Sequence, residues 1–268
     1  MENDPRKEPE HQAIPEERPP VEEPRQAQVM VKGMSHKPIA TYVILGLTIL
    51  VFLVQNISKL QFGVDFPLNL FAKINPRIVV GEYWRLISPI LAHASIMHIG
   101  FNMYALWILG RQIETLFGSE RFIMLYILGA FGGNVLSFAL SQNPSVGAST
   151  AIFALISAQA VFIIRNRKFF GPGSRQMLSQ IGFILVLNFV IAVVPGSSLD
   201  LWGHLGGFLA GVAFSILASP LLKLDTKDGR AILADASYRR DRYIAFLMVL
   251  VAFSAIVFIV IQRLNGSL

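Results

Sequence analysis

The sequence predicts an all-α protein that crosses a membrane several times, and three observations support this prediction. Hydrophobic residues make up 53% of the 268 residues, charged residues only 15%, and the mean hydropathy is +0.55. About seven apolar stretches approach the roughly 20 residues that a helix needs to cross the hydrocarbon. Several contain Gly or Ser, which membrane helices tolerate when their neighbours pack closely. A soluble domain of this length could not cover so much apolar surface.

The chain begins with a polar segment, and the apolar stretches follow it. Residues 1–37 are rich in Pro, Glu and Arg and have almost no large apolar side chains. Such a segment cannot bury enough surface to offset its ordering entropy, so we predict a disordered tail. No cleavable signal peptide precedes the first apolar run, which we expect to act as its own insertion signal. The expected spanning helices cover residues 38–56, 94–117, 121–141, 148–165, 177–195, 202–219 and 243–262.

Lys and Arg residues between the helices predict the orientation. The cytoplasmic loops of membrane proteins carry an excess of these residues. The connection after the fourth helix contains Arg165, Arg167, Lys168 and Arg175. The connection after the sixth contains Lys223, Lys227, Arg230, Arg239, Arg240 and Arg242. We therefore expect a cytoplasmic N-terminus and an outer C-terminus, although the first outer loop, 57–93, also carries four basic residues.

Charge and cysteine content exclude several classes of function. The net charge is +6, but the basic residues lie between apolar segments and form no single face, so we expect no nucleic-acid partner. The chain has no cysteine, which excludes disulfides, thiolate catalysis and cysteine–zinc sites.

Three polar residues are predicted to lie at a similar depth in the membrane. At about 1.5 Å per helical residue, they stand roughly 20 to 28 Å from the basic residue that marks the cytoplasmic edge. The separations are 16 residues from Ser149 to Arg165, 19 from His204 to Lys223 and 13 from His98 to Arg111. All three therefore fall in the outer half of the bilayer, on the second, fourth and sixth helices.

Ser149 is the first candidate for chemistry. It follows Gly147 and Ala148 at the start of the fourth helix. A helix N-terminus offers free N–H groups and a positive dipole end, both of which suit an oxyanion. The alternative is a small-residue seam used only for helix packing.

His204 opens the sixth helix, and glycines follow it on the same face. Gly207 and Gly211 lie three and seven residues further on. They would let another helix backbone approach closely, as a hydrogen bond between Ser149 and His204 requires. A packed polar residue or a metal ligand is the alternative for this histidine.

His98 and Asn102 share a face of the second helix because they are four residues apart. Both can donate hydrogen bonds to a developing oxyanion. His93 and His98 could instead join His204 in a zinc site. The spacing of five turns the first two about 140° apart on a regular helix, and no H-E-x-x-H motif is present. We therefore favour a site without metal.

Two further residues admit two interpretations each. Asp200, four residues before His204, could complete a triad, but an aspartate just ahead of a helix is more often an N-cap. Phe153, one turn after Ser149, could orient the His204 ring or could be an ordinary core residue.

These motifs together resemble the rhomboid family of intramembrane serine proteases. The resemblance covers roughly residues 38–220. It rests on the following residues in order: Glu82-Tyr83-Trp84-Arg85, the H-x-x-x-x-H-x-x-x-N pattern of His93, His98 and Asn102, Gly147-Ala148-Ser149, and His204 with Gly207 and Gly211. It implies a six-helix catalytic core at 38–220. The expected basic linker at 221–242 and the seventh helix with an outer tail at 243–268 lie outside it, although six helices plus one C-terminal helix is a known variant of the family.

The resemblance also implies roles for these residues. Ser149 and His204 would form a catalytic dyad without an acidic member, and His98, Asn102 and the Ser149 N–H would bind the oxyanion. Gly147, Phe153, Gly207 and Gly211 would support the site. Two departures are visible. Thr150 stands where the family usually has glycine, which puts rate or substrate choice in doubt, and Gly203 stands where alanine is common.

The expected activity is hydrolysis of a peptide bond in or near the membrane helix of another protein, through an acyl-enzyme and without a cofactor. Its partners would be the lipid bilayer and substrates whose transmembrane segment is easily unwound. A non-catalytic relative that escorts membrane clients is the main alternative, and a transporter or channel is the second. The short loops favour a bacterial plasma membrane over a eukaryotic organelle.

Overall fold

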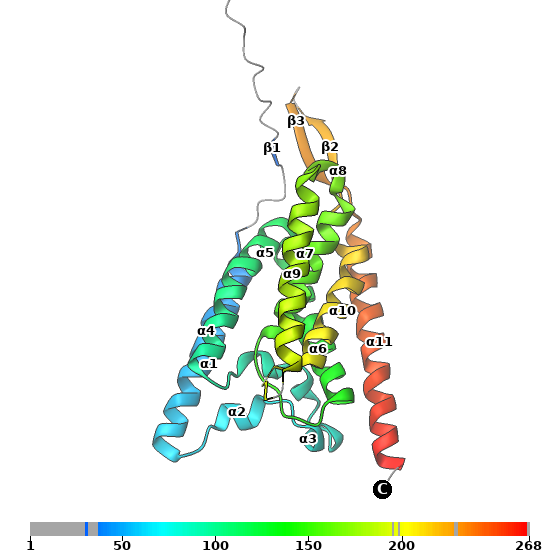
Figure 1. The fold of residues 1–268 in the computed structure, drawn as a ribbon. Coiled ribbons are helices and arrows are strands. Elements are labelled where there is room, and N and C mark those ends of the chain that lie inside the picture. The colour runs from blue at the N-terminus through cyan, green and yellow to red at the C-terminus, as the bar shows by residue number, and fades with distance from the viewer. Residues whose placement is uncertain (1–29, 32–36, 195, 198, 228–229, 267–268) are drawn as a thin grey trace, which may run out of the picture.

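A computed structural model describes residues 30–31, 37–194, 196–197, 199–227 and 230–266. Most of the tail predicted to be disordered, 1–29 and 32–36, lies outside the described residues. Figure 1 shows a bundle of long helices with short helices gathered at one end and a small sheet at the other. We call these the loop end and the sheet end.

Each predicted span corresponds to a helix or to a run of helical segments. The bounds are α1 Ile39–Phe62, α4 Ile96–Ala105, η3 Leu106–Gly110, α5 Arg111–Phe117, α6 Ser119–Leu140, α7 Ser149–Arg165, α9 Gly173–Val193, α10 Leu201–Ala218 and α11 Arg239–Gly266. Among the described residues, α1, α6, α9, α10 and α11 are long and apolar enough to cross a membrane as single helices. The second predicted span is α4, the π-helical η3 and α5 in succession, and α7 is shorter, with 17 residues. The prediction of an all-α polytopic membrane protein is confirmed.

The short elements gather at the two ends of the bundle. Those of the loop end are α2 Phe66–Phe71, α3 Asn75–Val79, η1 Tyr83–Leu86 and η2 Ser88–Leu91. Those of the sheet end are α8 Arg167–Phe170, β1 Met30–Val31, β2 Leu222–Lys227 and β3 Arg230–Asp235. In the sheet, β3 pairs antiparallel with β2 and parallel with β1. Hydropathy did not predict these strands, which lie in the expected linker 221–242 and in the tail.

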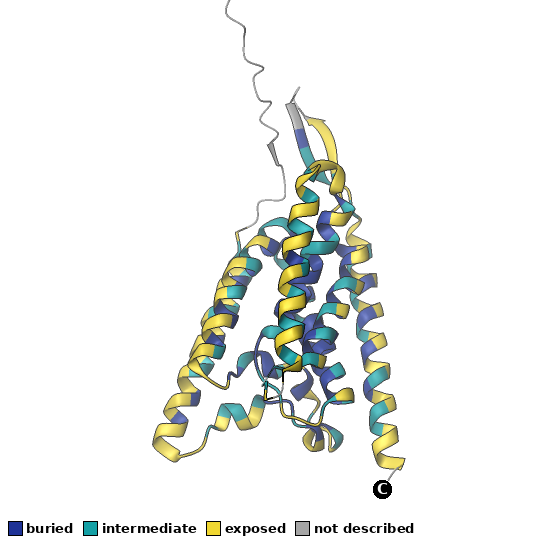
Figure 2. Ribbon diagram, viewed as in Figure 1, coloured by how far each residue is buried: buried dark blue, intermediate teal, exposed yellow. Residues whose placement is uncertain are grey.

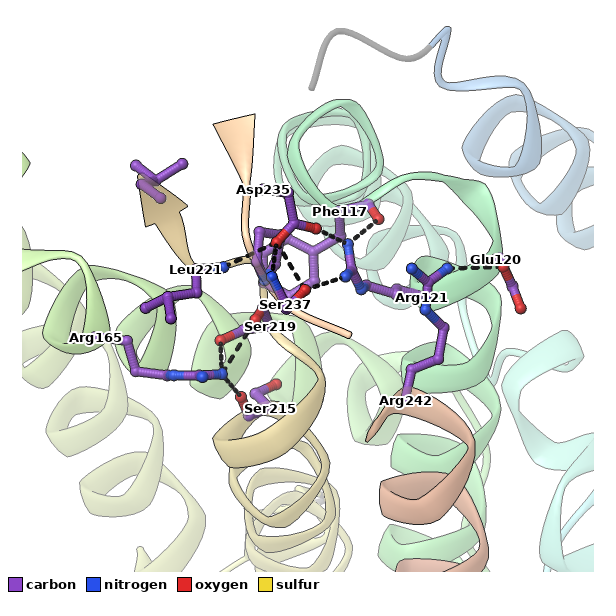
Figure 3. Close-up of polar contacts among 12 residues, drawn as sticks. Phe117, Glu120, Arg121, Arg165, Ser215, Ser219, Leu221, Asp235, Ser237 and Arg242 are labelled. Carbon is purple, nitrogen blue, oxygen red and sulfur yellow. Dashed lines mark hydrogen bonds and ion pairs between the residues drawn. The ribbon is translucent and has the colours of Figure 1, made fainter. Parts of the chain in front are cut away.

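Ion pairs join α6 to the hairpin β2–β3 and to α11 (Figure 3). Arg121 of α6 is only 4% exposed, and its guanidinium lies 2.8 Å from the Asp235 carboxylate. It also donates to Ser237 Oγ at 2.5 Å. Arg242 at the start of α11 pairs with Glu120 of α6 at 2.8 Å. The described part of the linker, 221–227 and 230–242, is therefore packed onto the bundle.

The core lies around α6, and the helices at the edge of the bundle have fewer buried residues (Figure 2). In the most apolar window of each helix, 67% of the residues of α6 and 50% of those of α10 are buried, against 6% for α9. The seventh helix, α11, contributes a stripe of four buried residues at every fourth position: Ala245, Val249, Phe253 and Val257. Membrane helices that expose apolar side chains can face lipid, so α9 has the character of a peripheral helix.

Candidate active site

Ser149 and His204 lie next to each other at the loop end of the bundle. Ser149 is the first residue of α7, and His204 lies in the first turn of α10. Ser149 Oγ and His204 Nε2 are 2.9 Å apart, which is hydrogen-bond distance. His204 is only 3% exposed, whereas Ser149 is partly exposed. Two residues 55 positions apart in sequence thus meet with the geometry of a nucleophile and a base.

The His204 ring is held from one face by an aromatic side chain. Phe153 of α7 stacks on it, with ring centroids 4.2 Å apart and planes inclined by 14°. Phe153 follows Ser149 by one helical turn, so α7 supplies both the hydroxyl and the support for its partner. Of the two interpretations of Phe153, contact with the His204 ring is the one that the structure shows.

Asp200 is an N-cap, as one of its two interpretations predicted. Its Oδ1 accepts from the Gly203 N–H at 2.8 Å, at the start of α10. His204 Nδ1 is buried and has no hydrogen-bond partner among the described residues. The carboxylate therefore serves the end of the helix and makes no hydrogen bond to the imidazole.

Close contact between α7 and α10 makes the pair of residues possible. A Cβ built on Gly207 would lie 2.0 Å from the main-chain oxygen of Thr150, and one on Gly211 would lie 2.6 Å from Ala154 Cα. Any side chain at Gly207 would therefore separate the helices. The Thr150 side chain itself lies against α6, because a Cβ at Gly133 would come within 2.5 Å of Thr150 Cβ. Thr150 thus packs between helices.

His98 and Asn102 of α4 lie beside the turn that leads into α7. Gly147 has a φ of +116°, a conformation that favours glycine, and its N–H donates to Pro89 O at 2.8 Å. A Cβ at Gly147 would lie 2.6 Å from His98 Nε2 and 3.8 Å from Asn102 Nδ2. Two potential donors therefore converge on the residues just before Ser149, where a helix N-terminus also presents N–H groups.

His93 has a position that the sequence did not reveal. Its Nε2 accepts from the Ala148 N–H at 3.3 Å, and its ring meets the His98 ring at 5.0 Å between centroids. Gln55 of α1 holds the main chain of His93 by two hydrogen bonds of 3.1 Å. The sequence pointed to His93 as a possible zinc ligand and as part of the pattern shared with the rhomboid family, and predicted no contact for it. The structure gives it a contact to the chain that carries Ser149.

Lys73 is a second residue that sequence reasoning missed. It lies between α2 and α3 and is 0% exposed, although it is a lysine in a loop. Its Nζ donates to the carbonyls of Ser137 at 3.3 Å and Ser141 at 3.1 Å, at the end of α6. Burial lowers the pKa of Lys73 from 10.5 to about 8, and the nearby carboxylate of Asp200 opposes this shift.

The lowered pKa of Lys73 predicts how stability changes with pH. Between about pH 8 and 10.5 the unfolded chain binds more protons at this lysine than the folded protein does, so stability rises with pH. This gain in the free energy of unfolding is fully present above pH 10.5 and is lost as the pH falls through 8. The free energy of unfolding changes by at most about 1.4 kcal/mol per pH unit. We expect the melting temperature of the wild type in detergent to rise relative to Lys73→Met between pH 7 and 10. The melting temperature of the wild type should show no such rise relative to Lys59→Met, at an exposed lysine of α1. Parallel curves of melting temperature against pH for wild type and Lys73→Met would contradict the prediction.

Comparison with known proteins gives several matches to one family. A sequence model of the Rhomboid domain matches residues 80–221, which is more than half of the chain. The rhomboid protease GluP of Bacillus subtilis is 36% identical over 192 residues, covering 71% of this chain and 36% of GluP. RHOMBOID-like protein 9, chloroplastic, of Arabidopsis thaliana is 32% identical over 160 residues, 60% of this chain and 37% of the relative. Rhomboid-like protease 1 of Toxoplasma gondii is 32% identical over 159 residues, 59% and 52% respectively.

The chain spans between about a third and a half of the length of these curated relatives. The matched region contains Ser149, His204, His98 and Asn102. The long apolar helices agree with an integral membrane protein. On the match to the domain and its relatives, this chain belongs to the rhomboid family.

Proposed function

We propose that this protein is an intramembrane serine endopeptidase that cleaves a peptide bond in or near the transmembrane segment of other membrane proteins. The observation that carries the proposal is the 2.9 Å contact between Ser149 Oγ and His204 Nε2, beside His98 and Asn102. The relatives named as rhomboid proteases support the same class of reaction.

The proposed reaction begins with a proton transfer within the pair. Ser149 Oγ attacks the substrate carbonyl carbon while neutral His204 takes the hydroxyl proton at Nε2. The carbonyl oxygen becomes an oxyanion, which the His98 ring N–H, the Asn102 carboxamide and the Ser149 N–H stabilise. His204 returns the proton to the amine as the C–N bond breaks, leaving an acyl-enzyme on Ser149. Water, activated by His204, then hydrolyses the ester and regenerates the hydroxyl. No cofactor takes part in the proposal.

The site restricts the substrates that can react. His204 and Asn102 are buried, and the carbonyls of an intact helix are already hydrogen-bonded. A substrate segment must therefore unwind before its carbonyl can reach Ser149, which favours small residues and helix breakers near the cleaved bond. A cavity of about 440 Å³ lies at the loop end and is lined in part by Gln55 and His93, but neither Ser149 nor His204 lines it.

The orientation is part of the proposal. We place the loop end outside and the sheet end in the cytoplasm, because the connections of the sheet end carry the larger number of Lys and Arg residues. The short loops fit a bacterial plasma membrane.

Covalent labelling tests the proposed function. We expect a fluorescent fluorophosphonate to label the detergent-solubilised protein and to leave Ser149→Ala unlabelled, because only an activated serine reacts. Ser157→Ala, at a buried serine of the same helix that bonds to Ala154 O, is the matched control and should be labelled. A folded wild type that takes no label would instead favour a client-binding relative without protease activity.

A further inference from the structure

Lys73 joins two parts of the loop end that carry the proposed dyad. Its main chain pairs with Ser145, donating at 2.9 Å and accepting at 3.1 Å. Ser145 lies four residues before Ser149, in the turn that leads into α7. The Lys73 ammonium points away from Ser145, to the last carbonyls of α6, where the helix dipole favours a cation. One residue thus contacts both the approach to Ser149 and the end of α6.

From α6, the contacts continue to the helix that carries His204. Ser137 Oγ donates to Asp200 Oδ2 at 2.5 Å, and Ser137 O accepts from Lys73 Nζ. The other carboxylate oxygen of Asp200 caps α10 at Gly203, and its main-chain oxygen accepts from the His204 N–H at 2.9 Å. The ammonium and the carboxylate attract each other across Ser137. The first turn of α10 is therefore linked to Lys73 through the two hydrogen bonds of Ser137, with opposite charges at the two ends of this link.

Gly203 fits this arrangement. A Cβ at this position would lie 2.6 Å from Asp200 Oδ2 and 2.8 Å from its Cγ. Glycine, rather than the alanine common in the family, leaves room for the carboxylate to turn toward α10 and Ser137. Gly203, which departs from the family pattern, and the buried Lys73 are thus parts of one local structure.

We propose that Lys73 is a positioning residue that acts through Ser137 and Asp200 to hold His204 in register with Ser149. The proposal rests on the proposed function for its effect on rate. Lys73 touches neither side chain of the dyad, so it sets their separation and takes no part in proton transfer. A displacement of about 1 Å in such a pair can cost up to roughly 10²-fold in rate.

The fold offers a clean way to remove this charge. In Lys73→Met, Ser137 O would still accept from the Ser141 N–H, and Ser141 O would still accept from Asn75 Nδ2. No main-chain oxygen would lose its only partner, and the pairing with Ser145 uses main-chain atoms alone. Replacing a buried charge by an apolar side chain of similar size often leaves stability unchanged or raised. Slower labelling of Ser149 in a Lys73→Met protein that is no less stable would show that Lys73 positions the site and is not needed for folding.

The test measures the rate constant for fluorophosphonate labelling in wild type, Lys73→Met, Asp200→Asn and the double variant. Asparagine keeps the cap but removes the charge. We expect each single variant to be labelled about tenfold more slowly, at a melting temperature that is unchanged or raised at the same pH. The double variant should be no slower than the slower single variant, because both substitutions break the same charge pair. Lys59→Met should be labelled like the wild type.

Two results would overturn the proposal. One is a wild-type labelling rate in Lys73→Met, and the other is a double variant whose loss is the product of the two single losses. If the wild type takes no label, the proposed function fails, and ¹⁵N NMR of the imidazoles still decides the positioning. His204 is assigned by comparison with His204→Gln. Its resonance should move in Lys73→Met and stay in place in Lys59→Met, whereas an unmoved His204 resonance in Lys73→Met would refute the positioning role.

Discussion

Replacing His204 by glutamine is expected to lower the rate of peptide cleavage by at least about 10³-fold while the bundle stays folded. Glutamine has a similar reach and can still hydrogen-bond to Ser149, but its carboxamide is not a base and cannot carry the proton to the leaving amine. The measurement is cleavage of a fluorogenic peptide with a helix-destabilised transmembrane segment, together with the melting temperature in detergent.

The outcome distinguishes a base from a packed polar residue. His204 lies in a stack with Phe153, so a purely structural histidine would show its loss mainly as a lower melting temperature. Phe153→Leu is the matched comparison, because it removes the stack and keeps the base; we expect a smaller loss of rate. Cleavage at the wild-type rate in His204→Gln would contradict the proposed mechanism.

Gly207→Ala is expected to abolish labelling of Ser149 and to lower the melting temperature by roughly 5 °C, in line with the cost of overpacking. The new Cβ would lie 2.0 Å from Thr150 O, which belongs to the main chain and cannot rotate away. Helices α7 and α10 must move apart, and the 2.9 Å contact between Ser149 and His204 is lost with them.

Gly182→Ala in α9 is the control for this substitution. Nothing lies within 4 Å of a Cβ at that helical position, and alanine is the better helix former. This variant should therefore keep the wild-type labelling and melting temperature. If Gly207→Ala behaved like Gly182→Ala, the close approach of α7 and α10 would not be what brings the dyad together.

The helices could be predicted because the signal for each is local. A continuous apolar stretch near 20 residues predicts a spanning helix without knowledge of its neighbours. This reasoning fails where hydropathy does not mark the ends or the type of an element. α1 continues to Phe62, past the predicted end at 56, and the second span contains the π-helical η3. The strands β2 and β3 follow Pro220 in a polar segment that hydropathy assigned to a linker.

The candidate site was predictable to the extent that its residues form short motifs. The start of α7 near Ser149 and the cap at Asp200 follow from helix geometry and spacing. Phe153 had two interpretations, and only the packing of α7 on α10 decided for its contact with His204. The contacts of His93 and Lys73 could not be found in this way. Their partners, Ala148 and Ser137, lie more than 50 residues away in sequence and are main-chain groups, which carry no signature in the side-chain pattern.

By itself, the sequence determined the class of protein, the approximate positions of its long apolar helices, and the candidates for nucleophile and base, because these depend on composition and on spacing along one helix. Only the tertiary structure decided that α7 and α10 approach closely enough at Gly207 for Ser149 to meet His204. It also decided that a loop lysine is buried against α6 and Asp200. Both depend on how separate helices pack, and packing is set by contacts between residues far apart in the chain.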